Sequence, residues 1–190
     1  MNRELIRIND YISFFPSSDE PLSSNVFFIE GDDNTYIFDV GRCNEAYDVI
    51  EEIKKDKIII ISHFHGDHFD NIERITYSDL YVGSYTFKHI NKGNIVKDKV
   101  CINDGIQLEI ISASSVHAKG SLLLNINKEY CLIGDLVHYE PPLNKSLACM
   151  MLLDMEKIDT KYFVLGHRKE CVFEKNGFIS KLKKDMNIVK

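Results

Sequence analysis

The chain carries the run Lys57-Ile58-Ile59-Ile60-Ile61 and, one residue later, the hexapeptide His63-Phe64-His65-Gly66-Asp67-His68. A short apolar run rich in β-branched residues is typical of a buried central strand. Because side chains alternate along an extended segment, His63 and His65 can point to the same side and bind one metal ion. The hexapeptide therefore predicts a metal site in the loop that leaves a rigid strand.

The second half of the hexapeptide predicts a neighbouring ligand position. A helix is predicted at residues 69–75, so the chain turns near Asp67 and His68 and directs them away from the first pair. We expect Gly66 to permit the tight bend between the pairs. A buried imidazole without a metal is the ordinary alternative for one histidine, but three histidines and an aspartate within six residues indicate metal binding.

Three further candidate ligands follow predicted strands farther along the chain. His117 lies in a loop between two strands, Asp135 follows the strand at residues 130–133 through Gly134, and His167 follows the strand at residues 162–165 through Gly166. Side chains at strand ends can converge on a rigid scaffold. With the hexapeptide they provide enough ligands for two metal ions.

Length and composition indicate one globular unit, so we expect a single domain over residues 1–190. Apolar residues make up 44% of the chain and charged residues 27%, which is ordinary for a globular protein. The net charge of −6 argues against a nucleic-acid partner, because such binding depends on clustered Lys and Arg. The five cysteines form no C-x-x-C pair, which favours reduced thiols. No secretory signal or membrane-spanning run is recognisable, so we expect a cytoplasmic protein with no membrane partner.

The order of apolar patterns predicts an α/β protein with two β-rich halves. Strands are predicted at residues 6–15, 26–30, 35–39, 57–61, 80–82, 95–102, 106–112, 121–126, 130–133 and 162–165. Helices are predicted at residues 45–55, 69–75, 85–90, 147–158 and 178–189. Because each half has helices that could cover one face of its sheet, we expect two stacked sheets between outer helices.

The hexapeptide resembles the H-x-H-x-D-H motif of the metallo-β-lactamase superfamily, and four other segments resemble the remaining motifs of that family in the same order. These segments are Ile37-Phe38-Asp39-Val40-Gly41, His117-Ala118-Lys119-Gly120-Ser121, Gly134-Asp135 and Leu165-Gly166-His167. The resemblance implies a four-layer αβ/βα sandwich with a dinuclear site in the cleft between the sheets. Leu165 replaces the usual Pro and Ala118-Lys119 replaces the usual Thr-Pro, and neither change removes a ligand.

The resemblance also implies roles for individual residues. The first metal would be bound by His63, His65 and His117, the second by Asp67, His68 and His167, and Asp135 would bridge both. Asp39 would orient a ligand imidazole by a hydrogen bond to its other nitrogen. Two Zn²⁺ ions suit these nitrogen and oxygen donors, which would also accept Fe or Mn.

The expected function is hydrolysis of a small thioester, ester or lactone by a metal-bound hydroxide, with Asp67 helping to orient the attacking water. The closest likeness is to hydroxyacylglutathione hydrolases and other small thioesterases or lactonases. The acid at position 135 argues against a β-lactamase. Only residues 168–190 follow His167, which leaves no room for the helical segment that forms the substrate groove of glutathione thioesterases.

The sequence leaves other functions open. A small phosphodiester is an alternative substrate, and an iron-containing redox or oxygen-handling protein or a noncatalytic ligand sensor are alternatives of other classes. If the protein is an enzyme, its expected partner is a small-molecule substrate. His138 and Tyr139 come just after Asp135 and are candidates for contact with the substrate, although packing or surface roles are the ordinary alternative.

Overall fold

The isoleucine run forms the centre of a seven-stranded sheet. The computed structural model describes residues 4–188. In it, β7 (Asp56–Ile61) pairs in parallel with β6 (Asn34–Phe38) on one side and β8 (Asp79–Gly83) on the other. Ile59, Ile60 and Ile61 are fully buried. The predicted central strand is therefore confirmed.

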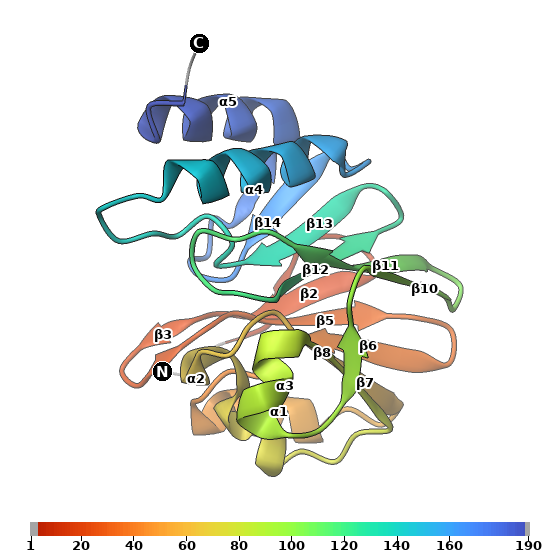
Figure 1. Cartoon of the computed structure of the whole chain (residues 1–190). Coiled ribbons are helices and arrows are strands. Elements are labelled where there is room, and N and C mark those ends of the chain that lie inside the picture. Colours follow the sequence, from red (N-terminus) through yellow and green to blue (C-terminus); the bar gives the residue numbers. More distant parts are fainter. Residues whose placement is uncertain (1–3, 189–190) are drawn as a thin grey trace.

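Thirteen strands form two sheets that stack face to face (Figure 1). The first sheet has the order β1-β2-β5-β6-β7-β8-β9 and the second the order β10-β11-β12-β13-β14-β15. The remaining strands of the first sheet are β1 (Ile6–Arg7), β2 (Ile12–Phe15), β5 (Val26–Glu30) and β9 (Asn94–Val96). The second sheet consists of β10 (Lys99–Asn103), β11 (Gln107–Ala113), β12 (Ser121–Ile126), β13 (Tyr130–Gly134), β14 (Tyr162–Leu165) and β15 (Val172–Glu174). A small separate hairpin comprises β3 (Ser18–Asp19) and β4 (Leu22–Ser23).

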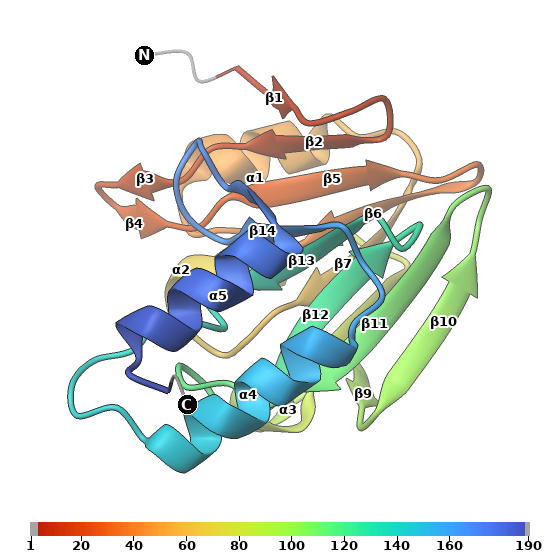
Figure 2. The ribbon, with the colours of Figure 1, turned by 90° about the horizontal axis from the view of Figure 1, so that it is seen from above.

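Helices cover the outer face of each sheet (Figure 1). The first sheet is covered by α1 (Asn44–Glu51), α2 (Gly66–Phe69), the 3₁₀ helix η1 (Asp70–Glu73) and α3 (Ser84–Ile90). The second is covered by α4 (Lys145–Lys157) and α5 (Lys175–Asp185), which lie next to each other in both views (Figure 2). No helix among residues 4–188 combines the length and apolar character needed to cross a membrane.

Strand alternation explains the layers. In β7, Ile60 packs into the core between the two sheets, whereas Ile59 and Ile61 pack against the layer that contains α1. The second sheet likewise buries Leu132 between the sheets and Ile133 under α4 and α5. The predicted αβ/βα sandwich is confirmed.

Two predicted strands are each interrupted. Residues 6–15 form β1 and β2, an antiparallel pair, because Asn9 Oδ1 accepts hydrogen bonds from the backbone N–H groups of Tyr11 and Ile12 and stabilises a turn. Residues 95–102 form β9 in the first sheet and β10 in the second. An apolar pattern reports that a segment is extended but not which sheet it joins.

Several element boundaries also differ from the prediction. The helix expected at residues 69–75 starts earlier, at Gly66, so Asp67 and His68 are helical residues. The helix expected at residues 45–55 ends at Glu51, and the last helix ends at Asp185, while Val189 lies outside the described residues. The strands β3, β4 and β15 were not predicted, because two or three residues are too few to show a period.

Candidate metal centre

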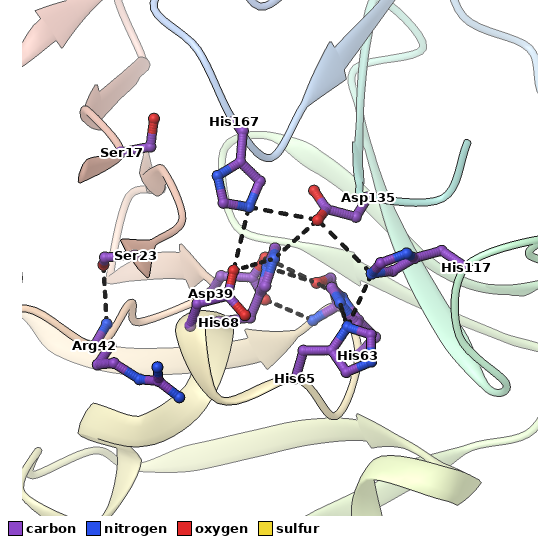
Figure 3. Close-up of polar contacts among 12 residues, drawn as sticks. Ser17, Ser23, Asp39, Arg42, His63, His65, His68, His117, Asp135 and His167 are labelled. Carbon is purple, nitrogen blue, oxygen red and sulfur yellow. Dashed lines mark hydrogen bonds and ion pairs between the residues drawn. The ribbon is translucent and has the colours of Figure 1, made fainter. Parts of the chain in front are cut away.

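All seven candidate ligands meet at one edge of the two stacked sheets, and Figure 3 labels each of them except Asp67. His63 and His65 follow β7, and the two hexapeptide residues Asp67 and His68 lie on α2. The second sheet contributes His117 from the loop between β11 and β12, Asp135 directly after β13, and His167 two residues after β14. The site therefore requires both halves of the chain.

One group consists of three imidazoles. His65 Nδ1 lies 3.0 Å from His63 Nε2 and 2.8 Å from His117 Nε2. Burial lowers the pKa of His63 well below its usual range and lowers the pKa of His117 to about 4. At neutral pH these rings are uncharged, which is the form in which imidazole binds a metal ion.

The second group combines histidines and carboxylates. Asp67 Oδ2 lies 3.5 Å from His68 Nε2 and 3.3 Å from His167 Nε2. Asp135 Oδ2 lies 3.5 Å from His68 Nε2, 3.4 Å from His167 Nε2 and 3.8 Å from His117 Nε2. Asp135 is thus the carboxylate that approaches both groups.

The carboxylates make the second group favourable for positive charge. Burial acts to lower the pKa of His68, but Asp39 and Asp135 outweigh it and raise that pKa to about 10. Burial is likewise outweighed at His167, where Asp135 and Asp67 raise the pKa to about 9. The Asp135 carboxyl is buried, which raises its pKa, yet its close contacts with the His167 and His68 imidazoles bring the pKa well below its usual range. The same negative field would stabilise a bound cation.

Ser62 and Asp39 hold the imidazoles in place behind the ligand atoms. Asp39, which has a left-handed φ of 61°, accepts hydrogen bonds from Ser62 N at 2.7 Å, Ser62 Oγ at 2.8 Å and His68 Nδ1 at 2.7 Å. Because the Ser62 hydroxyl donates to Asp39, its oxygen accepts from His63 Nδ1, 2.9 Å away. These bonds fix the tautomers so that Nε2 of His63 and His68 is free to bind metal.

The sequence analysis missed Ser62, although its position gave a signal. It is the polar residue between the isoleucine run and the hexapeptide, where a buried strand ends. The hydroxyl has no recognisable role until the fold brings Asp39 beside it.

The donor set fits a metal ion. His68 Nε2 is buried and has no hydrogen-bond partner among the described residues, which is costly unless a further ligand is bound there. Imidazole nitrogens with carboxylate oxygens are donors that Zn²⁺, Fe and Mn all accept. The residues therefore match the metals that the resemblance implies.

Glycines permit close contacts around this centre. Gly66 lies where the chain changes from extended His65 to α2 and does not have a positive φ, so the need for glycine there comes from the space around it. A Cβ there would overlap the Arg42 guanidinium and lie 2.7 Å from Asp70 Oδ1. Gly134 has a φ of 51°, and a Cβ there would lie 2.9 Å from both Cβ and Oγ of Ser62. The second glycine lets the two sheets approach at the site.

Asn25 links the His167 loop to the first sheet, and the sequence analysis gave it no role. Its side chain is fully buried, its Nδ2 donates to the Arg168 carbonyl at 2.9 Å and the Leu165 carbonyl at 3.4 Å, and its backbone N–H donates to the Gly166 carbonyl at 2.7 Å. Arg168 has a φ of 80°, a backbone conformation that non-glycine residues adopt only when neighbours hold it. Asn25 therefore positions His167.

A cavity of about 860 Å³ opens over the ligands and is lined by His65, Asp67, His117, Asp135 and His167. His138 also lines it, with its ring centroid 5.3 Å from that of His117. Tyr139 is not among the lining residues but packs against the core under α4 and α5, which is the packing role given as the alternative. Although few residues follow His167, α5 forms part of the cavity wall.

Comparison with known proteins shows a partial sequence match and a shared fold. A sequence model of the metallo-beta-lactamase superfamily matches residues 19–76, which include the hexapeptide. No curated protein sequence matches the chain. DIM-1 metallo-beta-lactamase aligns with a TM-score of 0.74 over 98% of this chain and 98% of its own, at 14% identity. The chain has the metallo-β-lactamase fold.

Two further structures show how widely this fold is shared. A metallo-beta-lactamase from Pontibacter korlensis aligns with a TM-score of 0.72 over 97% of both chains, at 13% identity. A flavo di-iron protein mutant from Thermotoga maritima aligns with a TM-score of 0.69 over 96% of this chain and 60% of its own, at 12% identity. At these identities the likeness establishes the fold alone.

We predict that Ser62→Ala weakens metal binding by about 10- to 100-fold, because the His63 and Asp39 side chains lose their shared hydrogen-bond partner. Ser18→Ala is the control, since this buried hydroxyl donates to the Pro21 carbonyl away from the ligands. Titration with a competing chelator measures both affinities. Equal affinities in Ser62→Ala and the wild type would contradict the role of Ser62.

We predict that Asn25→Ala lowers the metal affinity of the site that includes His167 by at least about 10-fold, because the His167 loop loses its hydrogen bonds with the Asn25 side chain. Asn125→Ala is a matched control, since this buried amide donates to Glu109 and Asp159 instead. Metal content and chelator competition separate a lost second ion from general destabilisation. A lower melting temperature with unchanged metal binding would show that Asn25 has a structural role only.

Proposed function

We propose that this chain is a hydrolase that uses two divalent metal ions, with Zn²⁺ favoured, to cleave a small thioester, ester or lactone. The observation that carries the proposal is the convergence of five histidines and two aspartates beside one cavity. Proteins of this superfamily are mostly hydrolytic enzymes, which supports the reaction class. The narrower likeness to hydroxyacylglutathione hydrolases rests on the sequence motifs alone.

In this proposal the seven residues divide between two ions. His63, His65 and His117 would hold one ion, Asp67, His68 and His167 the other, and Asp135 would contact both. Such ions, when bound, supply an acidified water as nucleophile and polarise a substrate carbonyl. Ser62 and Asp39 would keep the imidazole Nε2 atoms directed at the ions.

Two side chains have further roles in the proposed reaction. Both contacts of Asp67 with His68 and His167 use Oδ2, so Oδ1 would accept a hydrogen bond from the attacking water and orient it. His138 lines the cavity beside His117 and would donate a proton to the leaving group. The substrate is a small molecule, and the net charge of −6 disfavours a nucleic acid. A cytoplasmic location remains a prediction.

A second candidate is an iron-containing redox protein. The similarity in fold to the flavo di-iron protein favours it, because the same types of donor would accept iron. Metal identity separates the two candidates.

We predict that the purified wild-type protein carries two equivalents of zinc and hydrolyses members of a chromogenic panel of thioesters, esters and lactones. His63→Ala and Asp135→Ala should lose metal and reduce turnover to background, because each removes a ligand. His89→Ala should keep both, since His89 is exposed and stacks on Phe64 outside the ligand groups.

Full activity in either ligand variant would refute the assignment. Iron with visible absorbance would support the redox candidate. Cleavage of added phosphodiesters alone would change the substrate class, and absence of turnover in every class would favour a sensor.

A further inference from the structure

The cavity has an apolar wall that the proposed reaction does not use. Phe173 of β15 and two residues of α5, Phe178 and Leu182, line it. The rings of Phe173 and Phe178 stack with centroids 5.2 Å apart. Leu22, in the β3–β4 hairpin, also lines the cavity although it is 49% exposed. These side chains form an apolar surface beside the metal ligands, as in cavities that bury the apolar part of a ligand.

Two cationic side chains line the same cavity. Arg168 directly follows His167, and Lys181 lies on α5. Neither makes an ion pair with a residue in the described range. Two other lysines of α5 are engaged elsewhere, because Lys183 pairs with Glu156 at 2.6 Å and Lys175 donates to the Ile158 carbonyl. Lys181 therefore faces the cavity without a carboxylate partner.

Two acidic groups, Glu174 and Asp185, line the same wall. Glu174 accepts hydrogen bonds from the backbone N–H groups of Asn176 and Gly177, which commits its carboxylate to the N-terminus of α5. Asp185 is the remaining acid of the wall, one helical turn after Lys181. The wall therefore holds two cations and two carboxylates, and Arg168 and Lys181 form no ion pair with either carboxylate among the described residues.

We propose that the cavity selects an amphipathic acyl substrate, whose apolar chain packs on Phe173, Phe178 and Leu22 and whose separate anionic group binds to Arg168 and Lys181. This inference rests on the function proposed above, because it takes the same cavity as the substrate site. The apolar wall supplies affinity, and the cations fix the orientation of the chain relative to the ligands. A short neutral ester would use neither feature.

Alkyl sulfonates test this inference without turnover, because a sulfonate carries a fixed negative charge and is a weak metal ligand. Binding of butane-, hexane- and octanesulfonate to the metal-loaded protein is measured by isothermal titration calorimetry below their micelle concentrations. Affinity should rise with chain length by up to about fourfold per buried methylene. Octyltrimethylammonium, which has the same chain and the opposite charge, should bind at least about tenfold more weakly than octanesulfonate.

Two pairs of variants separate the cavity from the general surface. Lys181→Ala should weaken octanesulfonate binding by about three- to tenfold, whereas Lys184→Ala, an exposed lysine of α5 outside the cavity lining, should not. Leu22→Ser should weaken it severalfold, whereas Leu153→Ser should not, because Leu153 is 53% exposed on α4 but does not line the cavity.

The outcomes distinguish this inference from the proposed function. Three results would each overturn the inference, even if short esters are hydrolysed. They are an affinity that does not depend on chain length, equal binding of the cationic probe, and equal effects of Lys181→Ala and Lys184→Ala. Binding with the predicted pattern but without hydrolysis of any ester, thioester or lactone would support the ligand class and reject the hydrolase.

Discussion

The candidate metal centre depends on the two sheets keeping a fixed position relative to each other at one edge. Two backbone hydrogen bonds join the sheets at that edge. Leu122 N donates to the Ser62 carbonyl and Asn25 N donates to the Gly166 carbonyl, and both donor–acceptor distances are 2.7 Å. Gly134 permits the approach, because a side chain there would meet Ser62. Since the ligands come from both sheets, any sliding of one sheet on the other would separate them, and the buried core between the sheets resists such sliding.

The same edge gives the two ligand groups different electrostatic properties. Burial keeps the imidazoles of His63 and His117 neutral, whereas Asp67 and Asp135 create a negative field around His68 and His167. Both conditions favour metal binding, one through free nitrogen lone pairs and the other through opposite charge. A buried polar cluster of this kind is costly for a fold to maintain without a ligand, so it marks a functional site.

The sequence predicted the candidate ligands, the layers and the supporting Asp39, but not the supports Ser62 and Asn25. The hexapeptide and the strand ends at Asp135 and His167 are local patterns, and each sheet alternates its side chains with a recognisable period. Ser62 and Asn25 act through contacts with residues far away in sequence, so nothing local distinguishes them from other buried polar residues. The change of sheet after β9 and the place of α5 in the cavity wall likewise depend on tertiary packing. Tyr139 shows the converse, since its position soon after Asp135 made it a candidate for substrate contact, whereas it lies half-buried against the core under α4 and α5.

The most direct test of the central claim is anomalous X-ray diffraction from crystals of the zinc-loaded protein, recorded on both sides of the zinc absorption edge. The account predicts two anomalous peaks, one among His63, His65 and His117 and one among Asp67, His68 and His167, with Asp135 touching both. A single peak, or zinc bound only outside these residues, would contradict it.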